Sequence, residues 1–190
     1  MTTVLLPKNR GLAAQALRAL EDLVCPHGVE RRLVRGEDVP YLAREIARSG
    51  RPVFGVTGDD LVDEWLASGG TLGERLKRRR ISWSDPQAVF GKPALCFIAR
   101  KGASVVKTGR MRVAFCTRYR MLTERYLQRW EALGIAVERV PIQGAVESAL
   151  LAGVADFIVD VVVSGRTIRE AGLEVREVIS TSDLAVLESV

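Results

Sequence analysis

Short apolar runs alternate with stretches of helical spacing along this chain, and the alternation forms two separate series. The predicted strands cover residues 4–7, 31–35, 52–56, 81–83, 94–99, 111–116, 136–141, 157–163 and 173–179, the last one in the chain. The predicted helices begin at or near residues 9, 38, 61, 122, 145 and 168. This rhythm predicts parallel sheets covered by helices, an α/β fold. Two such series in 190 residues predict two lobes with a ligand cleft between them.

The composition is that of an ordinary globular protein, with 47% hydrophobic and 27% charged residues. No apolar run approaches the roughly 18 residues that cross a bilayer. The first residues lack the basic and apolar regions of a signal peptide. We therefore expect a cytoplasmic protein without a membrane partner.

The net charge of +5 suits anionic ligands but does not choose among them. The densest basic run, residues 77–80, is short and lacks interleaved aromatic side chains, so we interpret it as a solvated helix end. A nucleic-acid partner is not expected. Cys25, Cys96 and Cys116 lie far apart and form no CxxC pair, which argues against a disulfide framework or a zinc site. His27 is interpreted as an exposed loop residue.

The most informative segment runs from Asp160 to Thr167, where an apolar strand leads directly into a Ser-Gly-x-Thr turn and a helix. Such a turn presents backbone N–H groups at the positive end of a helix, and Gly165 lets the backbone approach a ligand closely. Ser164, Arg166 and Thr167 add donors, which together predict a phosphate-binding loop. Taken alone, Ser164 and Thr167 could equally be ordinary helix caps.

The segment belongs to a longer string, E-x5-G-x-A-x2-I-x-D-V-x2-S-G-x-T-I, from Glu147 to Ile168. This string closely resembles the signature of the ATP phosphoribosyltransferase family, which acts first in histidine biosynthesis. Further segments resemble other family motifs in the same order. They are residues 5–12 (the PKGRL turn), 35–40 (R-x2-D-I-P), 55–61 (G-I-T-G-x-D-L) and 119–126 (Y-P-N-L-T-x2-Y).

The resemblance implies a two-lobed fold like that of the type II periplasmic binding proteins. Residues 1–90 with 170–190 would form domain I, and residues 91–169 would form domain II. The implied reaction transfers the 5-phosphoribosyl group of phosphoribosyl pyrophosphate (PRPP) to N1 of ATP and releases pyrophosphate. Adenine N1 is already a nucleophile, so the protein would mainly position two anions and no acid or base residue is assigned.

The resemblance also assigns ligand-binding residues. Those implied to bind PRPP are Glu147, Asp160, Val163, Ser164, Gly165, Arg166 and Thr167. Those implied to face the nucleotide or pyrophosphate are Lys8, Arg10, Thr57, Gly58, Asp60 and Tyr119. Each could instead be structural: a solvated cation, a turn or cap residue, a packing aromatic, or an exposed helix carboxylate. Magnesium would arrive with the pyrophosphate of PRPP, without protein ligands.

The resemblance further points to the family's short form, because the chain leaves no room for the regulatory domain of the long form. Short-form chains work with a regulatory subunit related to histidyl-tRNA synthetase, so such a partner and a homodimer are expected. The chain departs from the family mainly on the nucleotide side, at Asn9, Lys92 and residues 120–121. Two alternatives follow from these departures and from the fold: a related transferase with another purine acceptor, and a non-catalytic binding module.

Overall fold

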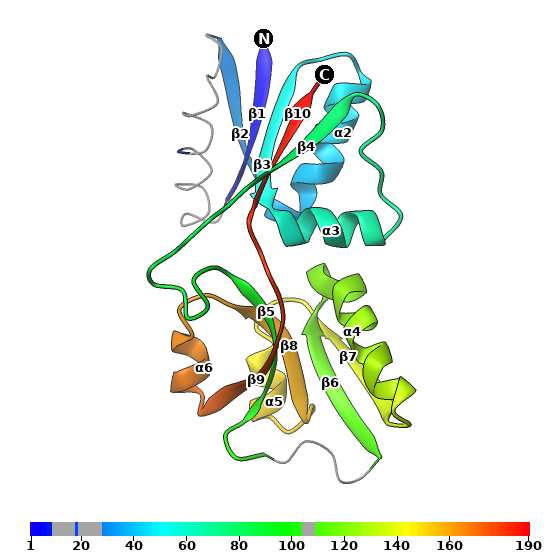
Figure 1. The fold of residues 1–190 in the computed structure, drawn as a ribbon, viewed down its shortest axis with the longest axis vertical. Coiled ribbons are helices and arrows are strands. Elements are labelled where there is room, and N and C mark those ends of the chain that lie inside the picture. Colours follow the sequence, from blue (N-terminus) through cyan, green and yellow to red (C-terminus); the bar gives the residue numbers. More distant parts are fainter. Residues whose placement is uncertain (9–17, 19–27, 104–108) are drawn as a thin grey trace. The chain divides into compact units, whose positions relative to one another are not determined.

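A computed structural model describes residues 1–8, 18, 28–103 and 109–190, which form two compact units. Unit 1 contains Met1–Trp83 and Asp183–Val190, and unit 2 contains Ser84–Ser182 (Figure 1). The predicted first helix lies outside the described residues apart from residue 18, and Arg10, Cys25 and His27 also lie outside them. None of the described helices is long and apolar enough to span a membrane.

Unit 1 is built on a five-stranded sheet with the order β2-β1-β3-β10-β4. Its strands are β1 (Thr2–Pro7), β2 (Val29–Val34), β3 (Val53–Gly58), β4 (Leu76–Ile81) and β10 (Leu184–Ser189). β1 runs parallel to β2 and β3, whereas β10 runs antiparallel to β3 and β4. The predicted parallel pairing is confirmed for β1, β2 and β3, but not for β10, the chain's last strand, which enters the sheet between β3 and β4 and runs antiparallel to both.

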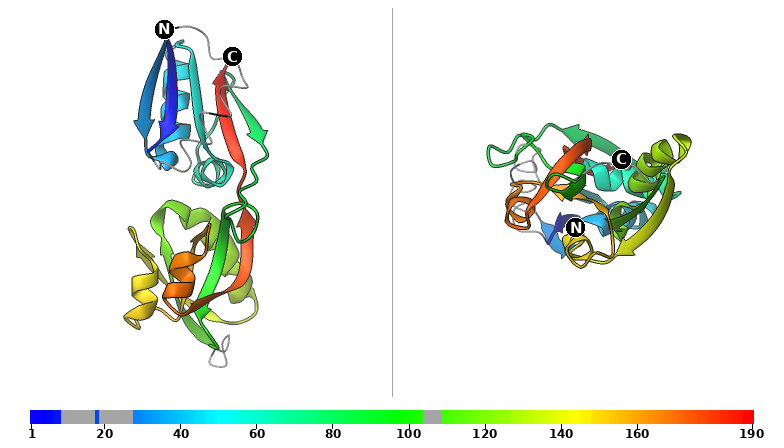
Figure 2. Two further views of the ribbon diagram at one scale, coloured as in Figure 1. Left: turned by 90° about the vertical axis from the view of Figure 1, so that its left-hand side faces the viewer. Right: turned by 90° about the horizontal axis from the view of Figure 1, so that it is seen from below.

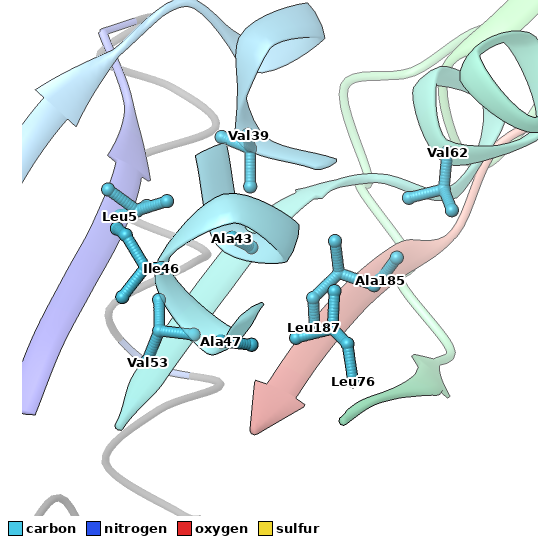
Figure 3. Packing of buried hydrophobic residues seen from close by; sticks show 10 residues of the cluster. All are labelled: Leu5, Val39, Ala43, Ile46, Ala47, Val53, Val62, Leu76, Ala185 and Leu187. Atoms are coloured by element: carbon cyan, nitrogen blue, oxygen red, sulfur yellow. The ribbon is translucent and has the colours of Figure 1, made fainter. Parts of the chain in front are cut away.

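Two helices and one short 3-10 helix complete unit 1: α2 (Val39–Arg48), α3 (Asp59–Ala67) and η1 (Gly36–Asp38). The buried residues of α2 recur at helical spacing and include Val39, Ala43 and Ile46. They pack with Leu5 and Leu187 in the core cluster of Figure 3. This packing holds α2 against β1 and β10.

The basic run at residues 77–80 lies in β4, so its interpretation as a helix end was wrong. In this strand Arg78 is level with Leu187 of β10, and Arg80 is level with Ala185. Backbone pairing with β10 is a long-range interaction that a local charge pattern does not reveal. The strand places Arg78 and Arg80 on one face and Arg79 on the other.

Unit 2 contains a second five-stranded sheet, with the order β7-β6-β8-β5-β9. Its strands are β5 (Ala94–Arg100), β6 (Arg110–Cys116), β7 (Ala136–Ile142), β8 (Phe157–Val162) and β9 (Leu173–Thr181). β6 is parallel to β7 and β8, and β5 is antiparallel to β8 and β9. Its helices are η2 (Thr117–Tyr119), α4 (Arg120–Ala132), α5 (Glu147–Leu151) and α6 (Arg166–Glu170) (Figure 2).

An aromatic cluster centred on Phe97 of β5 holds α4 against this sheet. The Phe97 ring lies 4.8 Å from Phe157 of β8 and 5.4 Å from Tyr126 of α4, measured between ring centroids. The Tyr126 hydroxyl donates a hydrogen bond of 2.8 Å to Glu177 of β9. The cluster therefore anchors α4, whose first turn follows the carboxyl end of β6.

The chain passes between the units at different points from the predicted domain boundaries. Residues 84–90 and 170–182 were assigned to domain I, but they lie in unit 2. The reason is that β9 pairs with β5 along its length instead of returning to the first sheet. The strand that does return is β10, which the sequence pattern did not predict.

Candidate functional site

The predicted phosphate-binding loop of unit 2 connects β8 to α6. Gly165 occupies the N-cap position of α6 in a left-handed conformation, with φ 64°. Ser164 and Thr167 therefore do not occupy the N-cap position, and both residues are exposed. The Ser164 hydroxyl accepts a long hydrogen bond of 3.4 Å from the N–H of Arg166. The loop thus presents hydroxyl groups and a cation beside the start of a helix.

Gly165 is required for two separate reasons. Its positive φ is costly for residues with a side chain. In addition, a Cβ at this position would lie only 2.9 Å from Cγ2 of Val89. The backbone of Val89 is held beside the loop, because its N–H donates to the carbonyl of Val163 at 2.9 Å.

We expect Gly165→Ala to destabilise the protein by about 1 kcal/mol more than Gly153→Ala does. Gly153 has a similar φ of 72°, but a Cβ there would meet no atom within 4 Å. The two variants share the backbone strain, and only Gly165→Ala adds the clash with Val89. Urea unfolding of both variants measures the difference. Equal losses of stability would show that the loop accommodates the added methyl group.

Asp160 lies in β8, four residues before Ser164, and is largely buried. Its Oδ1 accepts a hydrogen bond of 2.8 Å from the N–H of Val161. Burial raises the pKa of Asp160 to about 6, against the opposing effects of that N–H and of Arg118, while the charge of Glu147 raises it further. Its partner in register on β5 is Cys96. Burial and the negative charge of Asp160 raise the pKa of the Cys96 thiol to about 12. Shifted pKa values cluster at functional sites, so Asp160 is a candidate site residue.

We expect Asp160→Asn to stabilise the ligand-free protein at neutral pH. The folded-state pKa of about 6 lies above the ordinary value of 3.8, so the stability of the wild type falls as pH rises between these values. Asparagine does not titrate, and the variant should gain roughly 2–3 kcal/mol over wild type between pH 4 and pH 7.5. Unfolding free energies measured at both pH values test this. A constant difference between the two proteins would contradict it.

Asp156→Asn is a matched control, because Asp156 lies just before β8, at the end of the strand opposite to the loop. Hydrogen bonding to Arg112 lowers the pKa of Asp156, so its contribution to stability is present above its ordinary pKa and is lost as pH falls through the folded value. This variant should therefore change stability in the opposite direction at neutral pH.

Two further predicted residues belong to unit 2. Tyr119 ends η2 and is buried, with the guanidinium carbon of Arg118 lying 5.4 Å from its ring centroid. Glu147 begins α5 and acts electrostatically on Asp160. Because β6 and β8 are parallel neighbours, Tyr119 and the loop follow the same edge of the sheet. Arg118 lies in the segment after a strand, residues 117–119, where the sequence pattern places ligand-binding residues, but no binding role was predicted for it.

The predicted nucleotide residues of unit 1 follow β1 and β3. Lys8 is exposed, and its N–H donates to the carbonyl of Val34 at 2.8 Å. β1 and β3 pair in parallel, so their carboxyl ends lie side by side. Thr57 and Gly58 complete β3 instead of forming a turn, and the buried Thr57 hydroxyl donates to the carbonyl of Gly36 at 2.8 Å. Asp60 lies in the first turn of α3 and is partly buried.

A cluster of charged residues beside this segment was not predicted. Nε of Arg78 donates to Oδ1 of Asp59 at 2.7 Å, and Nη2 of Arg78 donates to the Asp59 carbonyl at 3.0 Å. Nε of Arg80 lies 2.5 Å from Oδ2 of Asp59. The pairs are 19 and 21 residues apart in the sequence, so no local motif revealed them.

Comparison with known proteins decides the family. A model of the ATP phosphoribosyltransferase family matches residues 35–189. ATP phosphoribosyltransferase of Agrobacterium fabrum is 33% identical over 202 residues, covering 92% of this chain and 84% of that protein. The enzyme of Kocuria rhizophila is 34% identical over 166 residues, covering 85% of this chain and 50% of that protein.

The chain belongs to the ATP phosphoribosyltransferase family. It spans about half the length of several of the curated relatives that it matches. The loop from Asp160 to Thr167 lies in the segment that resembles the family signature, and residues 57–60 lie in the segment that resembles the G-I-T-G-x-D-L motif.

Solved structures confirm the predicted fold class. The ATP phosphoribosyl transferase (HisG:HisZ) complex from Thermotoga maritima contains a chain that matches with a TM-score of 0.69 and 24% identity, covering 99% of this chain and 87% of that one. The periplasmic aliphatic sulphonate binding protein SsuA from Escherichia coli matches with a TM-score of 0.59 and 14% identity, covering 97% and 60%. The two-lobed α/β fold is therefore shared by this family and periplasmic binding proteins.

Within residues 1–8, 18, 28–103 and 109–190, no group of three or more His, Cys, Asp or Glu side chains is arranged to hold a metal ion. A magnesium site formed wholly by such side chains therefore does not fit the described residues. Magnesium commonly binds through substrate phosphates with few protein ligands.

Proposed function

We propose that this chain transfers the 5-phosphoribosyl group of PRPP to N1 of ATP and releases pyrophosphate, the first step of histidine biosynthesis. The observation that carries the proposal is the loop from Asp160 to Thr167. It combines a largely buried carboxyl group, a left-handed glycine and exposed hydroxyl groups at the start of a helix.

In this proposal the loop binds the ribose 5-phosphate. Ser164, Thr167 and backbone N–H groups would donate to phosphate oxygens, and Asp160 would accept from ribose hydroxyls. During transfer the lone pair of adenine N1 forms a bond to the anomeric carbon. The bond from that carbon to pyrophosphate breaks, and its electron pair leaves with pyrophosphate. No base is needed to activate N1, so binding and orientation supply the catalysis.

The nucleotide and pyrophosphate are assigned to unit 1 at the ends of β1 and β3. Lys8 is an exposed cation suited to phosphate oxygens, and Gly58 allows close backbone approach. Arg10 remains a proposed ligand residue from the family motif. Tyr119 of unit 2 remains a proposed ligand residue from the family motif, although its side chain is buried.

Magnesium is proposed to arrive bound to the pyrophosphate of PRPP. When bound, it neutralises the leaving group's charge. The chain is proposed to form a homodimer and to act in the cytoplasm. The Thermotoga maritima structure contains HisG with HisZ, so a HisZ-like regulatory subunit is the proposed partner.

A second candidate is a related transferase that uses another purine nucleotide. Lys92 stands where the family carries an arginine, and lysine lacks the paired donors of a guanidinium group. Asn9 likewise replaces a family glycine. Both changes fall on the nucleotide side, whereas the loop from Asp160 to Thr167 keeps the family pattern.

The deciding experiment measures pyrophosphate release by the purified chain with PRPP, magnesium and ATP, with and without a HisZ-type subunit. We expect release with ATP in the presence of that subunit. Release with a different purine nucleotide but not with ATP would favour the second candidate. No release with any purine nucleotide, despite measurable PRPP binding, would overturn the transferase proposal and favour a binding module.

A further inference from the structure

Asp59 forms several hydrogen bonds and ion pairs, although the family motif assigns it no role. It occupies the variable position between Gly58 and Asp60, and its side chain is only 7% exposed. Both carboxylate oxygens and the carbonyl are bound by Arg78 and Arg80, and its N–H donates to the carbonyl of Asp183 at 2.8 Å. Every polar atom of Asp59 is therefore engaged.

Arg78 extends the cluster along α3. Its side chain is 16% exposed, and Nη1 donates to Oδ1 of Asp63 at 2.7 Å. The guanidinium group thus contacts the first and second turns of the helix. Buried ion pairs are expensive to desolvate, so the cluster is a poor source of stability compared with apolar packing. Its distinctive effect is to fix the direction of α3 relative to the sheet.

Hydrogen bonds connect the start of α3 to the two places where the chain passes between the units, Trp83 and Asp183. Asp183, whose carbonyl binds Asp59, also accepts a hydrogen bond of 3.1 Å on Oδ1 from the N–H of Trp83. Trp83 and Asp183 are the unit 1 residues at the two crossing points of the chain. The backbone of residues 57–60 is therefore held at a fixed place relative to both crossings.

We propose that Arg78 and Arg80 are positioning residues for the nucleotide segment, residues 57–60, and that they act on it through Asp59. The inference rests on the proposed function, which places the nucleotide and pyrophosphate at the ends of β1 and β3, where Thr57, Gly58 and Asp60 lie. A displaced Asp59 would carry both neighbours with it, because they are adjacent in the chain. Arg80 is the milder site for a test, since its side chain is 60% exposed.

The test compares Asp59→Leu/Arg78→Met and Arg80→Met with the control Arg79→Met. Arg79 is the neighbour on the opposite face of β4, is 56% exposed, and lies 3.8 Å from Glu188. We expect the double variant to unfold near the urea concentration of wild type, because a buried ion pair is replaced by apolar groups. Its Kd for ATP should rise roughly 10- to 100-fold, while its Kd for ribose 5-phosphate, which lacks the pyrophosphate, stays unchanged. Arg80→Met should show the same split more weakly, and Arg79→Met should show none.

Calorimetric titrations with ATP and with ribose 5-phosphate separate the outcomes. A folded double variant with the ATP affinity of wild type overturns the inference and leaves the proposed function intact. An equal loss of affinity for both ligands also overturns it, because the effect would then be global. A wild-type chain that binds no purine nucleotide overturns the proposed function and this inference together. If the double variant does not fold, Arg80→Met decides by the same criterion.

Discussion

Replacing both Asp160 and Thr167 by alanine is expected to lower kcat/KM for PRPP by roughly 10²- to 10⁴-fold. Each side chain is proposed to form a hydrogen bond with a charged or strongly polar group of the substrate, and such bonds contribute about 1.5–3 kcal/mol apiece. Two of them lost together correspond to this range of rates. The pyrophosphate-release assay, run at several PRPP concentrations, measures the change.

Loss of folding does not explain such a result, because removing the largely buried Asp160 carboxyl should stabilise the ligand-free protein at neutral pH. The matched control is Asp156→Ala, which precedes the same strand at its other end and pairs with Arg112 at 2.9 Å. That pair is partly exposed, and its loss should leave kcat/KM close to the wild-type value. Activity retained in the double variant would show that the loop does not bind PRPP.

Most strands were predictable from the sequence, because buried strands require apolar runs and these runs are short and well separated. β10 was missed for a specific reason. Only Ser182 and Asp183 separate β9 from β10, so no helix or recognisable turn divides the two strands, although they lie in different units. The antiparallel direction of β9 and β10 was also not predictable from the sequence, because it depends on where each strand enters its sheet.

The candidate site was predictable to different degrees in the two units. The loop from Asp160 to Thr167 is contiguous, so its motif could be read directly and its glycine conformation anticipated. Thr57 was predicted to follow a buried strand, but it lies within β3, and its burial and its bond to Gly36 depend on the packing of η1. The raised pKa of Asp160 likewise arises from tertiary burial, which a linear motif does not contain.

The basic run at residues 77–80 shows the limit of local interpretation. A cluster of arginines with no aromatic neighbours is usually solvated, and Arg79 and Lys77 follow that expectation as exposed or partly exposed residues. Arg78 does not, because α3 brings Asp59 and Asp63 over the same face of β4. The sequence carries no signal for this contact.

Arg78→Met is expected to destabilise the protein by roughly 2–4 kcal/mol, because it removes one partner of a largely buried ion pair and leaves the other in place. Methionine preserves much of the side-chain volume, but the Asp59 carboxylate loses its best-buried partner while remaining 7% exposed. Arg80 still contacts this carboxylate, which limits the loss. Asp63, with a side chain 45% exposed, can be hydrated and adds little to the cost.

Urea unfolding followed by circular dichroism measures this change, with Arg79→Met as the control. Arg79 carries the same charge on the same strand, but its partner Glu188 is 3.8 Å away and partly exposed, so its replacement should cost less than about 1 kcal/mol. Equal stabilities of the two variants would show that Arg80 and solvent stabilise the Asp59 carboxylate sufficiently without Arg78. Arg78→Met leaves the Asp59 carboxylate buried without Arg78, whereas Asp59→Leu/Arg78→Met removes both charges. A large loss of stability in the single variant, together with near-normal stability in the double variant, would show that the ion pair fixes the geometry of the cluster and does not stabilise the fold.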